Sequence, residues 1–86
     1  MKTRAQILEV LQKVLCDHLK GVTPEMATEE ANIKTDLGAD SLDTIELVLY
    51  MDEALGFEIS DEALDTFKDA TVGETATRLF EIQPKG

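Results

Sequence analysis

Apolar residues recur every three or four positions near the start of the chain, which is the spacing of one face of an α-helix. This pattern predicts an amphipathic helix over residues 3–19. Thr3 and Gln6 have the spacing of a capping box, in which each side chain accepts a hydrogen bond from the other residue's backbone N–H. Gly21 lies where a left-handed residue would end the helix. The predicted apolar face consists of Ile7, Val10, Leu11, Val14, Leu15 and Leu19.

The helical pattern stops between residues 22 and 37, where Thr23 and Pro24 begin a mixed polar stretch. We expect a long loop there, with one short turn near Pro24 and with Ile33 and Leu37 pinned to the core. Loops of this length in compact domains are typically functional or packed as ordered surface. The residues that follow the loop are therefore candidates for function.

A second helix is predicted over residues 41–55, because Asp40 is a good N-cap residue and Gly56 suits a left-handed C-cap. The pattern favours one broad side that packs against the core and another side that is acidic. The packing side is expected to contain Ile45, Val48, Leu49, Met51, Asp52 and Leu55, and the acidic side Asp43, Glu46, Tyr50 and Glu53.

The segment after Gly56 predicts loop anchors and a short helix. Phe57 and Ile59 alternate with a polar residue over too few positions for a strand, so we interpret them as loop residues that reach into the core. Ser60 is expected to cap a short third helix whose apolar contacts come from Leu64 and Phe67.

A last helix is predicted from the capping box of Thr71 and Glu74 to about Ile82, slightly weakened by Gly73. Its inward residues are expected to be Val72, Ala76, Leu79 and Phe80. Residues 1–86 are therefore predicted to form a single all-α domain, a small bundle of three longer helices and one short helix without a sheet.

Acidic residues are concentrated in the middle of the chain. The 86 residues hold 18 Asp and Glu against 8 Lys and Arg, a net charge of -10, which argues against nucleic acid and anionic membranes and favours basic partner proteins. The interval between Lys34 and Lys68 contains no base and ten acids, which equal the whole net charge: Asp36, Asp40, Asp43, Glu46, Asp52, Glu53, Glu58, Asp61, Glu62 and Asp65.

Cysteine usage and chain length restrict the chemistry further. Cys16 is the only cysteine, so an internal disulfide or a cysteine-based zinc site is excluded, and we expect an exposed free thiol there. For His18, near the end of the first predicted helix, we expect a packed or dipole-stabilising role. No apolar run reaches the length of a signal peptide or a membrane span, and a reducing cytoplasm fits best. A chain this short is expected to do its chemistry at the surface rather than in a deep cavity.

Ser41 lies at the predicted start of the second helix, after a glycine-containing turn. Free backbone N–H groups and the positive end of the helix dipole favour a phosphate esterified to its hydroxyl. Asp36, Asp40 and Asp43 oppose that negative charge, although the same carboxylates can hold a divalent cation beside a phosphate donor. The sequence therefore indicates a site for a phosphate-linked group.

The run from Leu37 to Leu47, with Asp40-Ser41-Leu42 at its centre, closely resembles the attachment motif of the acyl carrier proteins. A weaker likeness extends over nearly the whole chain. The resemblance implies a four-helix carrier-protein bundle that is not an enzyme. It also implies that 4′-phosphopantetheine from coenzyme A is attached to Ser41, with Asp40 and Leu42 as the other cofactor-binding residues, and carries acyl groups as thioesters.

The resemblance also implies partners and a surface that meets them. The partners are a holo-synthase, that is, a phosphopantetheinyl transferase using magnesium, and acyl-loading and acyl-processing enzymes with basic docking patches. We expect a cytoplasmic monomer. The implied partner-facing residues are Leu42, Asp43, Glu46, Leu49, Asp52, Glu53, Glu58 and Asp61. An apolar slot for the acyl chain is expected between helices, with Ile45, Val48, Ile59, Leu64 and Phe67 as candidate lining residues.

Other functions remain open or are excluded on specific grounds. A serine hydrolase is excluded because Ser41 lacks the Gly-x-Ser-x-Gly elbow and the chain has one histidine. An acidic helical interaction module that binds divalent cations remains an alternative, although the stretch from Asp36 lacks EF-hand spacing. The cargo also stays open, between fatty-acid, polyketide, lipid-modification and aminoacyl pathways.

Overall fold

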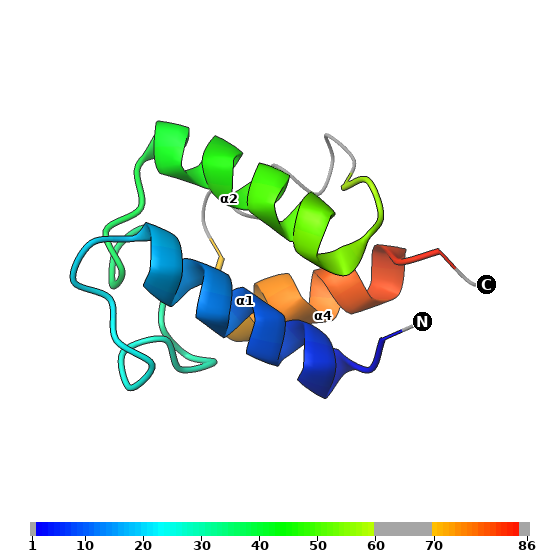
Figure 1. Cartoon of the computed structure of the whole chain (residues 1–86). Helices are drawn as coiled ribbons and strands as arrows, with labels where there is room; N and C mark the ends of the chain where they lie inside the picture. The colour runs from blue at the N-terminus through cyan, green and yellow to red at the C-terminus, as the bar shows by residue number, and fades with distance from the viewer. Residues whose placement is uncertain (1, 60–69, 85–86) are drawn as a thin grey trace.

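The computed structural model describes residues 2–59 and 70–84 and contains three helices in that part of the chain. These are α1 (Arg4–His18), α2 (Ser41–Leu55) and α4 (Val72–Ile82). Helix α1 packs against both α2 and α4, and the two ends of the chain lie at the same end of the bundle (Figure 1). The all-α fold is as predicted; the short helix expected after Ser60, with Leu64 and Phe67, lies outside the described residues.

Each helix begins with the local chemistry that the sequence predicts. The capping boxes of Thr3 with Gln6 and of Thr71 with Glu74 are both formed, and Asp40 caps α2. Gly56 ends α2 in the left-handed conformation, with φ of 78°. The prediction for Gly21 is wrong in one respect: α1 ends at His18 with an extended C-cap, and Gly21 takes its left-handed φ in the turn beyond.

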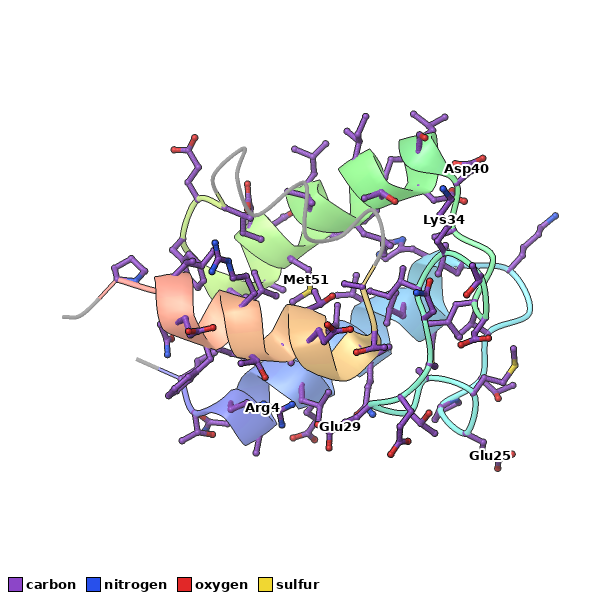
Figure 2. The ribbon with its side chains drawn as sticks, turned by 180° about the vertical axis from the view of Figure 1, so that it is seen from behind. Arg4, Glu25, Glu29, Lys34, Asp40 and Met51 are labelled. Carbon is purple, nitrogen blue, oxygen red and sulfur yellow. The ribbon has the colours of Figure 1, made fainter. Side chains whose placement is uncertain are left out.

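The core is built around α1, whose Ile7, Leu11 and Leu15 are completely buried. From α2, Leu47 and Met51 enter this core, and Met51 points inward from the helix in Figure 2. Helix α4 contributes Val72, Ala76 and Leu79, as predicted. The loop anchors are also confirmed, since Ile33, Leu37 and Ile59 are buried and Phe57 is partly buried against the core.

Two predicted core positions of α2 face solvent instead. Ile45 is 52% exposed and Leu49 is 61% exposed. Apolar residues occur on more than one side of α2, so periodicity alone did not identify the side that meets α1. Phe80 on α4, 36% exposed, was likewise wrongly expected to face inward.

The long loop between α1 and α2 is tied to the start of α4 by backbone hydrogen bonds. Asn32 and Thr71 form an isolated antiparallel bridge, in which Ile33 donates to Ala70 at 3.1 Å. The Gly73 N–H donates to the Glu29 carbonyl at 3.0 Å. These bonds hold the loop against the start of α4. They thereby fix the point at which the chain enters α2.

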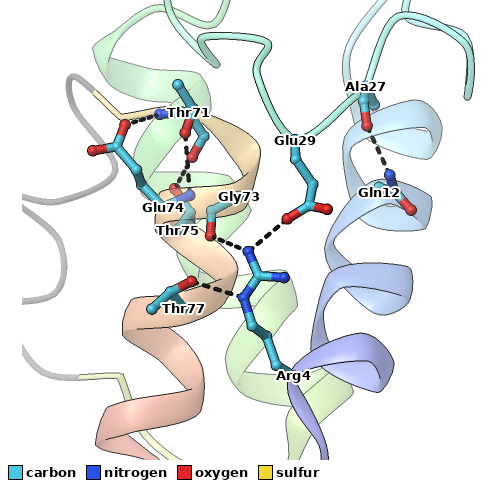
Figure 3. Close-up of polar contacts among 9 residues, drawn as sticks. All are labelled: Arg4, Gln12, Ala27, Glu29, Thr71, Gly73, Glu74, Thr75 and Thr77. Atoms are coloured by element: carbon cyan, nitrogen blue, oxygen red, sulfur yellow. Dashed lines mark hydrogen bonds and ion pairs between the residues drawn. The ribbon is translucent and has the colours of Figure 1, made fainter.

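Arg4 joins three parts of the chain at this junction (Figure 3). Its guanidinium donates to Glu29 Oε1 at 2.6 Å, to the Gly73 carbonyl at 3.1 Å and to Thr77 Oγ1 at 2.8 Å. The side chains of Arg4 and Glu29 are partly exposed, so the ion pair itself contributes little stability. The geometry nevertheless connects α1, the loop and α4.

Of the two α1 residues singled out in the sequence, Cys16 differs from expectation, whereas His18 lies in the last turn of the helix and packs against a ring of α2. Cys16 is partly buried against the core rather than exposed, and burial, followed by the neighbouring Asp17 charge, raises the pKa of its thiol. The His18 side chain is exposed and stacks on Tyr50 of α2, with ring centroids 3.6 Å apart. The ring pair adds a contact between α1 and α2.

Candidate functional site

Ser41 is the first residue of α2 and is exposed to solvent. The left-handed Gly38, with φ of 77°, turns the chain toward the helix, and Ala39 N–H donates to the Ile33 carbonyl at 3.1 Å. Asp40 then adopts the extended conformation of an N-cap. The local sequence thus holds the Ser41 hydroxyl at a fixed, accessible point on the helix end.

The aspartates around Ser41 are hydrogen-bonded to backbone amides. Asp40 Oδ1 accepts from the Asp43 N–H at 2.8 Å, and Asp43 Oδ2 accepts from the Asp40 N–H at 3.2 Å. Asp36 Oδ2 accepts from the Asn32 N–H at 2.7 Å. Each aspartate therefore shapes the turn that presents Ser41, a role that was not predicted for Asp36 or Asp43.

No group of three or more His, Cys, Asp or Glu side chains suited to a metal ion occurs within residues 2–59 and 70–84. The three aspartates near Ser41 do not form such a group, and each is engaged with the backbone. A stable divalent-cation module is thus not favoured by this part of the chain.

The helix end offers free donors beside the serine. Within the described ranges, no acceptor is found for the backbone N–H groups of Ser41 and Leu42. These donors and the helix dipole favour a negatively charged group at this end. A small cleft of about 80 Å³ adjoins it, lined by Lys34, Ala39, Asp40, Ser41 and Thr44. The residues present therefore fit a phosphate ester on Ser41.

Lys34 is a residue of this site that the sequence reasoning missed. It precedes Ser41 by only seven positions and is the sole base between Lys20 and Lys68, which is the sequence signal that could have identified it. Figure 2 shows the Lys34 and Asp40 side chains close together at the start of α2.

One exposed stripe of α2 combines acidic and apolar side chains. Leu42, Glu46, Leu49 and Glu53 follow one another at steps of four, three and four, which places them on one side of the helix. All four are exposed, Leu42 by 63% and Leu49 by 61%. Large exposed apolar residues that lie together are typical of a protein-binding surface.

The remaining expected partner residues are distributed around this stripe. Asp43 and Asp52 are only partly exposed, and Asp52 Oδ1 accepts from the Ile59 N–H at 2.8 Å. Glu58 is exposed beyond the end of α2, and Asp61 lies outside the described residues. The described acids of the expected partner surface are therefore of two kinds. The glutamates are exposed, whereas the two aspartates also accept hydrogen bonds from backbone N–H groups.

The expected slot for an acyl chain is only partly represented. Val48 and Ile59 are buried, whereas the exposed Ile45 faces away from the interior, and Leu64 and Phe67 lie outside the described residues.

None of the described helices has the length and apolar character needed to cross a membrane.

Comparison with known proteins identifies the family. The model of the phosphopantetheine attachment site family matches residues 5–79. An acyl carrier protein of Afipia carboxidovorans is 46% identical over 81 residues, covering 94% of this chain and 98% of the relative. An acyl carrier protein of a Bradyrhizobium species is 44% identical over the same length. Among solved structures, the acyl carrier protein of Enterococcus faecalis superposes with a TM-score of 0.75 at 32% identity, covering 95% of this chain and 100% of that one.

These matches extend over the whole functional site. They bear out the resemblance to carrier proteins, and with it the role of phosphopantetheine and of acyl-processing enzymes as partners. The chain belongs to the acyl carrier protein family, whose members carry acyl groups on phosphopantetheine and are not themselves enzymes.

Proposed function

We propose that Ser41 is the residue that carries 4′-phosphopantetheine in this chain. The observation that carries the proposal is an exposed serine hydroxyl at the first position of α2, beside two free backbone N–H groups. When bound, the arm supplies a terminal thiol that holds acyl groups as thioesters. Ser41 Oγ provides the ester bond, and the amides of Ser41 and Leu42 stabilise the negative phosphate.

The aspartates have a positioning role in this proposal. Asp40 and Asp43 hold the first turn of α2 by their reciprocal hydrogen bonds, so that Ser41 keeps one orientation toward a transferase. Asp36 holds the preceding turn through Asn32. Their charges also attract the magnesium ion and the basic residues that we expect a transferase to bring.

We further propose that the exposed stripe of Leu42, Glu46, Leu49 and Glu53 is the docking surface for successive enzymes. Exposed charges contribute little affinity each, but together they accelerate encounter with a basic partner. The two leucines add apolar surface that is buried in the complex and becomes exposed to water again when the complex separates. Such an interface suits a carrier, which must bind quickly and leave again.

We propose that residues 1–86 act as one domain and as a monomer, in the cytoplasm, and that a phosphopantetheinyl transferase is the first partner. The high negative charge supports a monomer because like charges repel.

The attachment proposal is tested by intact mass after incubation with coenzyme A, magnesium and a broad-specificity phosphopantetheinyl transferase. The chain contains two serines, so Ser41→Ala and Ser60→Ala form a matched pair. We expect one added phosphopantetheinyl group on the unaltered chain and on Ser60→Ala, and none on Ser41→Ala. A mass gain on folded Ser41→Ala would reject the proposed site.

The docking proposal is tested by charge removal that leaves the caps intact. Glu46→Gln with Glu53→Gln removes two exposed charges from the stripe, whereas Glu9→Gln with Glu81→Gln removes two exposed charges from α1 and α4. We expect only the first pair to lower kcat/KM for loading, by several-fold at low salt and less at high salt. Equal effects of the two pairs would show that net charge, rather than this stripe, controls loading.

A further inference from the structure

Among the described residues, Lys34 is the one base that lines the cleft beside Ser41. No other Lys or Arg occurs between Lys20 and Lys68, so this ammonium group stands alone in the acidic middle of the sequence. The same cleft is lined by Asp40 and Thr44, and it measures about 80 Å³. The Thr44 hydroxyl already donates to the Asp40 carbonyl at 2.9 Å, so its proton is not available to a phosphate oxygen. Lys34 is the cation among the lining residues.

The backbone around Lys34 is held by a dense set of hydrogen bonds. Asn32 Oδ1 accepts from the N–H groups of Lys34, at 2.9 Å, and Thr35, at 3.0 Å. The Asn32 carbonyl accepts from Asp36 at 2.9 Å and from Leu37 at 3.1 Å. Because this turn leads directly into α2, its hydrogen bonds fix the position of the Lys34 backbone relative to Ser41.

The charge on Lys34 is available for a ligand. Within residues 2–59 and 70–84 the one ion pair closer than 4.0 Å joins Arg4 to Glu29, so Lys34 has no such partner there. The nearby carboxylates of Asp36, Asp40 and Asp43 are hydrogen-bonded to backbone amides. A phosphodiester on Ser41 would add one more negative charge to this acidic region, and Lys34 would be the nearest cation in the sequence.

We propose that Lys34 pairs with the phosphodiester of the arm on Ser41 and holds the first part of the arm on the loop side of α2. This proposal rests on the attachment at Ser41. The pair lies at the surface, so it is weak and screened by salt, and the distal thiol stays free to swing between enzymes. Lys34 is thus a positioning residue for the arm rather than a catalytic one.

The test compares apo and loaded forms of the full chain. Intact mass first confirms loading of the unaltered chain, of Lys34→Gln and of a control, Lys13→Gln, which removes the same charge from an exposed position of α1. If none of the three proteins is loaded, the attachment at Ser41 is refuted. That outcome is distinct from failure of the Lys34 pair, which is measured only on loaded protein. Urea unfolding then gives the folding equilibrium constant of each form.

At low salt, we expect Lys34→Gln to lower the folding constant of the loaded form by about two- to fivefold more than that of the apo form. The excess should shrink in high salt, and Lys13→Gln should show none. The ³¹P resonance of the phosphodiester should move in loaded Lys34→Gln and stay unchanged in loaded Lys13→Gln. A purely structural lysine would affect the apo and loaded forms equally and leave the ³¹P resonance in place, and that result would overturn the proposal.

Discussion

Replacing Gly73 by alanine should destabilise the protein, because the added Cβ would lie 3.1 Å from both the Cβ and the carbonyl oxygen of Glu29. Contacts this short require the neighbour to move. The Glu29 carbonyl has little freedom to do so, since it accepts the Gly73 N–H at 3.0 Å, and two residues further along the Ala31 carbonyl accepts the Val72 N–H at 2.9 Å. The substitution therefore acts on the junction that holds the long loop.

The size of the effect follows from opposing contributions. Alanine gains at most about 1 kcal/mol over glycine in helix propensity, and Gly73 lies in the first turn, where the gain is smaller. Overpacking costs about 1–3 kcal/mol. Weakening the Gly73 hydrogen bond costs about a further 1 kcal/mol. The expected net loss is about 2 kcal/mol, or a decrease in Tm of about 10 °C for a domain of this size.

Urea unfolding followed by far-ultraviolet circular dichroism measures this loss. Ala54→Gly is a control for helix propensity, because Ala54 is an exposed residue of α2. Because Ala54 lies in the last turn of α2, we expect Ala54→Gly to lower the free energy of unfolding by at most about 1 kcal/mol and Gly73→Ala to lower it by more. If Gly73→Ala instead stabilises the chain by about the amount that Ala54→Gly destabilises it, the close approach of Glu29 does not govern this position.

Three further predictions concern particular side chains. In urea unfolding, Leu47→Ala should lower the free energy of unfolding by about 2–5 kcal/mol, because Leu47 is 1% exposed. Leu49→Ala should lower it by less than about 0.5 kcal/mol, because Leu49 is 61% exposed. Similar losses would contradict the assigned packing side of α2. Asp40→Ala should cost about 1 kcal/mol through loss of the α2 cap, while an unchanged unfolding midpoint would argue against the capping box. Cys16 should react with iodoacetamide more slowly than a cysteine peptide at pH 8, because its raised pKa leaves less thiolate; an equal rate would contradict burial.

Local sequence chemistry predicted the beginnings of the helices well. The capping boxes of α1 and α4 depend on two side chains three residues apart, so neighbouring residues contain all the information needed. Gly56 ends α2 for a similarly local reason. Such features can be recognised without knowing how the helices pack.

Packing between distant segments was not predictable in the same way. The outward side of α2, shown by Ile45 and Leu49, depends on where α1 lies, and an apolar pattern around several sides of a helix does not encode that position. Gly73 was expected only to weaken its helix, whereas it allows close approach of Glu29 from 44 positions earlier in the chain. Contacts of this kind require the tertiary structure.

The candidate site shows the same division. The serine motif led to the proposal that Ser41 is the attachment residue, and the family resemblance suggested the chemistry that it would carry. The backbone roles of Asp36 and Asp43 and the position of Lys34 depend on a turn stabilised by Asn32, whose side chain accepts two backbone N–H groups. The motif therefore predicted which residue carries the group, and the structure added the neighbours that we propose to orient it.

Locating the group and its acyl cargo by peptide mass spectrometry tests the carrier function most directly. Trypsin cleaves after Lys34 and Lys68, so Ser41 and Ser60 fall in one peptide that fragmentation can resolve. After loading with an acyl-coenzyme A and a phosphopantetheinyl transferase, we predict an acyl-phosphopantetheinyl group on Ser41, with the acyl part released by neutral hydroxylamine as expected of a thioester. A group on Ser60, or an acyl part that resists hydroxylamine, would contradict an acyl carrier that works through Ser41.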